Sequence, residues 1–188
     1  AKLLGDWSPS ISAILNVTPN HLDRHPTMKD YVRAKRAITN YQKPEDAIVM
    51  SLDNDMTRTI GRQFGQKVRW FSLEAQMPHG AGLLNEDLVL FDAQVEPTVV
   101  TNKSAVKLRG SHNLSNILAA CLLAKEAGAS VEAMRAVITT FTGVEHRLEV
   151  VAEINGVTYV NDSISTSPER LIAALNAFSE SLILLAGG

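Results

Sequence analysis

The chain has 188 residues, 45% of them hydrophobic and 20% charged, with a formal net charge of −2 at pH 7. These values are typical of a globular protein with one large core or parts of two domains. They give no electrostatic case for binding to nucleic acid or to an anionic membrane surface. The single cysteine, Cys121, can form no internal disulfide, which indicates a cytoplasmic protein, and the longest apolar run, residues 117–124, is too short to span a bilayer.

The first predicted element is a buried strand over residues 11–17, followed by a loop that contains His21. Thr27 and Asp30 then fit a capping box, because a threonine hydroxyl and an acidic side chain three residues later can each satisfy a free amide of the first helical turn. A helix is therefore predicted from Met28 onward.

Lys35 is the unusual residue of this helix. At helical spacing it falls in the middle of an apolar stripe, formed by Met28, Tyr31, Val32 and Ile38. Burial disfavours an ammonium group and leaves a nucleophilic amine, which could act as a base, form a Schiff base or take up carbon dioxide as a carbamate. A carbamate beside His21 would suit a hard cation such as Mg2+. Spacing alone favours the alternative, a lysine that reaches past the stripe to water or pairs with Asp23.

The next segment alternates short strands and helices. Strands at 47–50 and 68–71 flank a helix over 54–64, for which Asp53 is the expected cap, and this order predicts parallel β-α-β units. Between residues 80 and 109, short apolar runs separated by turn residues predict small antiparallel strands. The sequence therefore predicts an α/β fold with a mixed sheet.

A long helix is predicted over residues 110–127, and a second helix, capped by Ser130, over 131–141. Asn113 and Asn116 lie three residues apart near the start of the first helix, so they can share an edge that faces a cleft. Spacing alone favours a capping role for these asparagines. A side-chain amide also donates and accepts hydrogen bonds at once, which suits adenine.

Residues 142–147 are interpreted as a hinge between two domains, and they include His146 and Arg147. A guanidinium there would supply permanent positive charge near phosphates or ribose, or would pair with Glu145 or Glu149 on the surface. Strands over 148–154 and 157–160 follow, and the Asn155-Gly156 pair between them predicts a hairpin.

The loop over residues 161–168 follows the carboxyl end of a strand, where open α/β sheets place ligands. It contains Asp162 and several hydroxyl side chains. Pro168 is expected to begin a helix that runs through Phe178, and a last strand is predicted over 182–185.

Four motifs in this order resemble those of the Mur ligases, and most closely the members that add glutamate to UDP-N-acetylmuramoyl-L-alanine. The motifs are NVTPNHLDRH with Lys35, GSHNLSN, TFTGVEHR and NDSISTSP. The resemblance implies that residues 1–142 form the later part of a P-loop-type central ATP-binding domain with a mixed sheet. Residues 143–188 would then begin a Rossmann-like ligand-binding domain.

The resemblance also implies roles for individual residues. His21 and a carbamylated Lys35 would be catalytic and would hold Mg2+. ATP would be bound by Asn113, Asn116, His146, Arg147 and Asp162. Asn20, Ser163 and Thr166 would contact substrate.

The implied reaction is ATP-dependent amide bond formation in cytoplasmic peptidoglycan precursor synthesis. The carboxylate of UDP-N-acetylmuramoyl-L-alanine would take the γ-phosphate of ATP, and the amine of D-glutamate would displace phosphate from the acyl phosphate. A monomer without nucleic-acid or membrane partners is expected. The alternatives are a Mur ligase with another acceptor, a folylpolyglutamate synthase, or a non-catalytic nucleotide-binding homologue.

Two features depart from the family pattern. Ile164 stands where many members carry a lysine, so a positive charge for the acceptor is missing at this position. The chain also contains no G-x-x-x-x-G-K-[ST] phosphate loop, and it begins without methionine and ends on an expected strand. We therefore expect the interior of a longer protein, and no catalysis from these residues alone.

Overall fold

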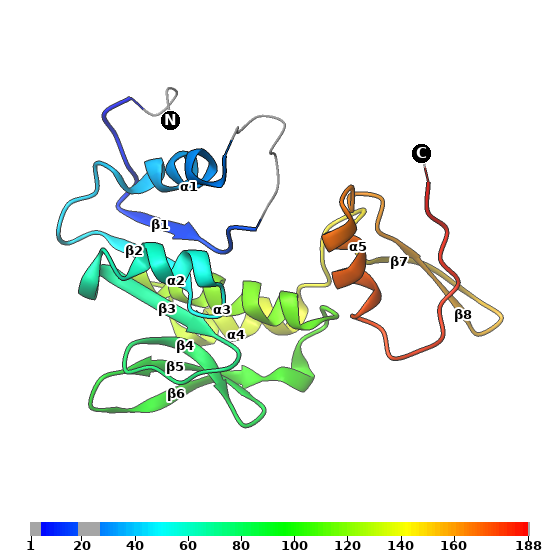
Figure 1. Ribbon diagram of the computed structural model, residues 1–188. Coiled ribbons are helices and arrows are strands. Elements are labelled where there is room, and N and C mark those ends of the chain that lie inside the picture. The colour runs from blue at the N-terminus through cyan, green and yellow to red at the C-terminus, as the bar shows by residue number, and fades with distance from the viewer. Residues whose placement is uncertain (1–4, 19–26, 188) are drawn as a thin grey trace.

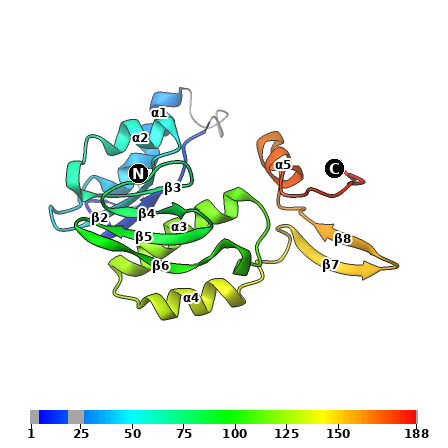
Figure 2. The same ribbon diagram turned by 90° about the horizontal axis from the view of Figure 1, so that it is seen from below.

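The computed structural model describes residues 5–18 and 27–187 of the chain. Figures 1 and 2 show a six-stranded sheet with helices on both faces, and a separate two-stranded hairpin with one helix to one side. The expected α/β class with a mixed sheet is therefore confirmed.

The large sheet has the strand order β1-β2-β3-β4-β5-β6. Neighbouring strands are parallel from β1 to β4 and antiparallel from β4 to β6. The strands are β1 (Ile11–Ile14), β2 (Ala47–Ser51), β3 (Val68–Ser72), β4 (Gly80–Leu84), β5 (Asp87–Asp92) and β6 (Val95–Asn102). The predicted first strand ends three residues early, although Val17 beyond it is buried.

Helices α1 (Met28–Arg36) and α2 (Asp55–Gly61) cover one face of the parallel strands. Short 3-10 turns follow α1 and α2, at Ala37–Thr39 and Gly65–Lys67. Strand β2 is buried on both faces, with Ile48 and Met50 packed toward these helices and Val49 toward the other side. This alternation follows from the two-residue period of a strand.

The two helix starts on this face differ in how well they were predicted. The Thr27 hydroxyl accepts from the Asp30 amide at 3.2 Å, as expected, while the Asp30 carboxylate accepts from that hydroxyl at 2.7 Å. For α2 the predicted cap, Asp53, is wrong: Asn54 caps the helix by accepting from the Thr57 amide at 3.0 Å. The Asp53 carboxylate instead accepts from the backbone amide of Leu73, directly after β3, at 2.8 Å.

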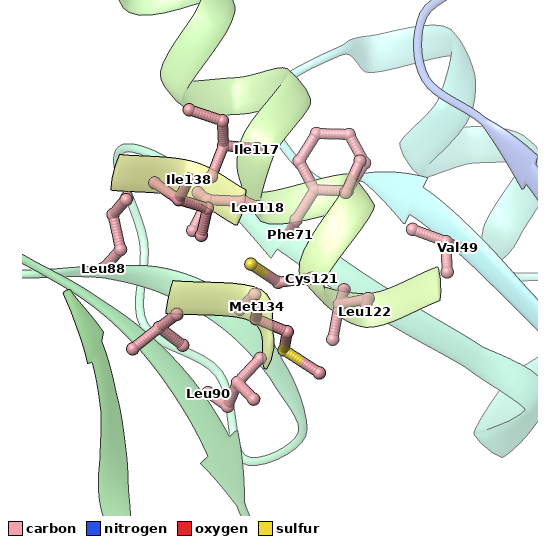
Figure 3. Close-up of a cluster of buried hydrophobic side chains, with 13 residues drawn as sticks. Val49, Phe71, Leu88, Leu90, Ile117, Leu118, Cys121, Leu122, Met134 and Ile138 are labelled. Atoms are coloured by element: carbon pink, nitrogen blue, oxygen red, sulfur yellow. The ribbon is translucent and has the colours of Figure 1, made fainter. Parts of the chain in front are cut away.

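Helices α3 (Ser111–Glu126) and α4 (Val131–Thr140) cover the opposite face. Helix α3 packs across strands β1 to β5, whereas α4 packs against β6 and α3. Figure 3 shows the core between them, in which Cys121 and Met134 meet side chains from the sheet such as Phe71 and Leu90. Ser130 caps α4 through the Ala133 amide, as predicted.

The remaining elements are β7 (Glu149–Ile154), β8 (Val157–Asn161) and α5 (Pro168–Leu175). Strands β7 and β8 form the predicted antiparallel hairpin, with positive φ at both Asn155 and Gly156. The predicted strand over 182–185 is wrong, because this segment pairs with no strand in the described part of the chain, and Ile183 remains 93% exposed. Apolar composition alone makes no strand without a neighbouring edge to bond to.

Candidate functional site

A largely apolar pocket of ≈ 560 Å³ lies between α3, α4 and the segment 141–147 that follows α4. Its walls are mainly alanine, isoleucine, valine and methionine side chains, and only three of its lining residues are strongly polar: Asn113, Asn116 and Arg147. A mostly apolar concavity with a few polar groups is typical of a small-molecule site. Two motifs that are separate in the sequence therefore meet around one pocket.

Asn113 and Asn116 both project from the first turns of α3, which begins after Gly110. Asn113 is only 8% exposed, and its Nδ2 donates to the Arg109 carbonyl at 2.7 Å. This bond uses one amide hydrogen and fixes the plane of the amide, which leaves Oδ1 and the second hydrogen for a ligand. Asn116, one turn further, is exposed.

Cys121 also lines the pocket. Burial raises the pKa of its thiol to about 11. The thiol is therefore protonated at neutral pH, and Cys121 contributes apolar surface rather than a nucleophile.

Arg147 and His146 lie in the turn between α4 and β7. The side chain of Arg147 is exposed and lines the pocket, and within the described residues no ion pair joins it to Glu149. Glu149 accepts instead from the His146 amide at 2.8 Å. Nδ1 of His146 accepts from the side-chain amide of Asn161 at 2.9 Å, and this bond joins the turn to the end of β8. His146 itself does not line the pocket.

Asp162 organises the loop after β8. One carboxylate oxygen accepts from the Leu148 amide at 3.1 Å and the other accepts from the Ser165 hydroxyl. The peptide amide of Ile164 donates to the His146 carbonyl at 3.3 Å. The turn 146–148 and the loop 162–165 are thus joined side by side, as the order of the two motifs alone could not show.

Ser163 and Thr166, two expected substrate contacts, are exposed in this same loop and line no part of the pocket. Ile164 is 42% exposed, and its carbonyl accepts from Nη1 of Arg170 at 3.4 Å. A cation from α5 therefore reaches the loop at the position where Ile164 supplies none.

His112 is a residue that the sequence reasoning missed. Partial burial and, next, the charge of Arg147 hold its pKa below the usual range, although Asp162 acts in the opposite direction. His112 therefore lies close enough to both residues to sense their charges. His112 lies inside the GSHNLSN motif beside Asn113, and this position in the motif could have marked it as a candidate site residue.

The structure overturns the argument for a buried Lys35. Its side chain is exposed, and its Nζ lies 5.5 Å from the ring centroid of Tyr31, which is the buried residue of α1. A nine-residue helix lying on the sheet buries a narrower stripe than the apolar pattern predicts. Lys35 also lies on the face opposite the pocket, since α1 and α3 cover different sides of the sheet. Asn20 and His21 lie outside the described residues.

Residues 5–18 and 27–187 lack two further kinds of feature. This part of the chain contains no group of three or more histidine, cysteine or acidic side chains that could hold a metal ion. It also contains no helix with the length and hydrophobicity to span a membrane.

Comparison with known proteins decides the family. The model of the Mur ligase middle domain matches residues 2–124. The chain belongs to the Mur ligase family. Of the candidate residues, Lys35, Asn113 and Asn116 lie inside this match, whereas Arg147 and Asp162 lie beyond it.

Several relatives carry the name UDP-N-acetylmuramoylalanine–D-glutamate ligase. The protein of Clostridium kluyveri is 45% identical over 96% of the chain, and that of Acetivibrio thermocellus is 44% identical over 96%. The aligned region covers only 38% of each relative. The chain thus spans about two fifths of the length of these Mur ligases.

Solved Mur ligase structures share the fold. MurF from Acinetobacter baumannii superimposes with a TM-score of 0.68 at 20% identity, covering 88% of this chain and 36% of MurF. MurF from Thermotoga maritima, solved in complex with ADP, gives a TM-score of 0.61 at 18% identity, covering 90% of this chain and 39% of that one. At these identities the likeness concerns the fold.

Proposed function

We propose that this Mur ligase chain forms the central part of an ATP-dependent ligase that adds D-glutamate to UDP-N-acetylmuramoyl-L-alanine. The observation that carries the proposal is the meeting of Asn113, Asn116 and Arg147 around one apolar pocket, because the pocket unites amides suited to a base with a permanent cation. The names of relatives at 41–46% identity support the choice of acceptor.

The apolar walls between α3 and α4 suit a purine ring, and the side-chain amides of Asn113 and Asn116 that line the pocket can recognise its hydrogen-bonding edge. Arg147 lines the pocket from the turn 146–148, so its guanidinium is suited to ribose or phosphate. Both carboxylate oxygens of Asp162 already accept hydrogen bonds, from the Leu148 amide and the Ser165 hydroxyl. A ribose hydroxyl that binds Asp162 would therefore share one of these oxygens with the protein. We propose the hinge between the two domains at residues 142–147, after α4.

In the proposed reaction, a carboxylate oxygen of UDP-N-acetylmuramoyl-L-alanine attacks the γ-phosphorus of ATP and ADP leaves. The amine of D-glutamate then attacks the acyl carbon, the bond between that carbon and the bridging oxygen breaks as phosphate leaves with the oxygen, and the nitrogen loses a proton. Positioning and electrostatic stabilisation supply most of the catalysis in such transfers. The described residues contribute to positioning the nucleotide.

We propose Mg2+ as the metal, held by His21 and by a carbamate on Lys35, on the resemblance of these residues to the family motif. When bound, Mg2+ would neutralise charge on the transferred phosphate. The exposure of Lys35 is compatible with access of carbon dioxide, but the amine gains no help from burial in the described residues. We further propose a monomer that acts in the cytoplasm.

The test uses the full-length protein that contains this sequence. With ATP and UDP-N-acetylmuramoyl-L-alanine, phosphate release should depend on D-glutamate and not on L-glutamate or L-lysine, and mass spectrometry should show the amide product. Preference for a different amino acid would refute the acceptor and leave the ligase reaction intact. No amino-acid-dependent phosphate release would refute the ligase proposal.

A paired substitution tests the pocket. Asn116→Ala should raise the KM for ATP about two- to tenfold, the range expected for one lost hydrogen bond, with little change in the melting temperature because the side chain is exposed. Asn40→Ala, at another exposed asparagine outside the pocket, is the matched control and should leave this KM unchanged.

A further inference from the structure

Arg109 connects the pocket to a segment about seventy residues later in the chain. Its carbonyl accepts from Nδ2 of the pocket residue Asn113 at 2.7 Å. Its guanidinium Nη1 lies 3.0 Å from Oε1 of Glu180, and its Cζ lies 5.1 Å from the ring centroid of Phe178. One residue therefore contacts the pocket through its backbone and the segment after α5 through its side chain.

The backbone around Arg109 is packed closely enough for such a connection to matter. Gly110 has φ of +89°, and a Cβ built on it would lie 3.0 Å from Cβ of Ala177 and 2.7 Å from Cε1 of His112. The segment after α5 therefore lies directly against the start of α3. A glycine is needed here both for the positive φ and for this close approach.

We infer that Arg109 is a positioning residue for nucleotide binding: docking of residues 178–180 on its guanidinium orients its carbonyl, which in turn holds the Asn113 amide. This inference rests on the proposed function of the pocket. When the segment is undocked, the side chain of Arg109 loses both partners, and the peptide that holds Asn113 loses its anchor. Nucleotide binding and segment docking are consequently linked, each favouring the other.

The contacts of the Arg109 side chain are partly exposed, and this limits how much they can change the affinity for nucleotide. Arg109 and Glu180 keep 44% and 57% of their side-chain surface exposed, so their ion pair is partly screened by solvent. An exposed ion pair and a cation–π contact together correspond to about a three- to tenfold change in affinity. The linkage therefore tunes the affinity for nucleotide and does not act as an all-or-none switch.

The experiment measures ADP affinity by calorimetry and backbone amide exchange by mass spectrometry, both in the full-length protein. Arg109→Ala, which removes both contacts, should raise the Kd for ADP about three- to tenfold, and Glu180→Gln, which keeps the contact between Arg109 and Phe178, should raise it less. Both variants should speed exchange in two peptides, residues 110–117 and 174–182. The exchanged pair Arg109→Glu with Glu180→Arg should bring the Kd closer to wild type than Arg109→Ala does, because the ion pair is rebuilt in reverse while the contact of Arg109 with Phe178 is lost.

Lys103→Ala is the matched control. Lys103 and Glu86 form an ion pair of 2.9 Å with 41% and 60% exposure, nearly the same as that of Arg109, and neither residue lines the pocket. This control should leave the Kd for ADP and the exchange of both peptides unchanged. The inference is wrong if Arg109→Ala behaves like Lys103→Ala, or if exchange speeds up in residues 174–182 alone.

The exchange measurement separates this inference from the proposed function. If the wild-type protein binds no ADP, the proposed nucleotide site fails. In that case the role of Arg109 in nucleotide binding fails as well, while coupled exchange of the two peptides in Arg109→Ala would show that Asn113 and the docked segment are connected and uncoupled exchange would refute that connection.

Discussion

The carboxylate of Asp162 accepts a hydrogen bond of 3.1 Å from the backbone amide of Leu148. This bond joins the loop after β8 to the turn that carries His146 and Arg147. The φ of Leu148 is +47°, an unfavourable value for a branched side chain, so the turn needs such support.

We expect Asp162→Ala to lower both stability and nucleotide affinity. A hydrogen bond to a charged group contributes about 1.5–3 kcal/mol, and the Leu148 amide would lose its acceptor. Urea unfolding and ADP titration of the full-length protein measure the two effects. Asp46→Ala is the control and should affect stability alone, since Asp46 accepts from the backbone amide of Lys43 at 2.6 Å and neither residue lines the pocket. Unchanged ADP affinity in Asp162→Ala would remove this residue from the site.

Lys35→Ala should cause a severe loss of amide synthesis, about ten- to a hundredfold or more, if a carbamate on its Nζ supports the metal. Added short carboxylates should restore part of the activity by replacing the missing oxygen ligand. Lys29→Ala, at an exposed lysine on the same helix, should keep normal activity. Near-normal synthesis by Lys35→Ala at saturating Mg2+ would refute the metal-binding role of Lys35 and leave only its contact with Tyr31.

Ile164→Lys should change the KM for the acceptor less than about tenfold, the equivalent of one charge-assisted contact, and should leave the preference for D-glutamate intact. The reason is that Arg170 already brings a cation to the Ile164 carbonyl. Val157→Lys, at an exposed valine of β8, controls for added surface charge. A switch of acceptor class in Ile164→Lys would show that this position selects the amino acid.

His112 should make stability depend on pH. Its folded-state pKa lies below the unfolded value, so both states are neutral at high pH, whereas the unfolded state alone takes up the proton as pH falls through about 6.5. The free energy of unfolding should therefore decrease below that pH. Urea unfolding at pH 7.5 and 5.5 should show a smaller decrease in His112→Gln than in wild type. Equal decreases would mean that another group causes the dependence.

The sequence by itself determined the elements whose signals are local. Thr27, Ser130 and the Asn155-Gly156 pair each act on atoms within a few residues, so their caps and turn formed as expected. The long apolar helix α3 and the alternation of strands and helices also need only periodicity to be recognised. The family motifs were likewise recognisable from the sequence alone.

Tertiary structure decided which of these residues meet. Asn113 and Arg147 reach one pocket because α3 and α4 pack side by side, and no local signal encodes that approach. Lys35 fell on the expected helix yet is exposed, since burial depends on how much of α1 the sheet covers. Asp53 accepts from the Leu73 amide and does not cap α2, and residues 182–185 formed no strand because no partner edge lies beside them in the described part of the chain. Local chemistry offers each group several partners, and only packing brings one of them within bonding distance.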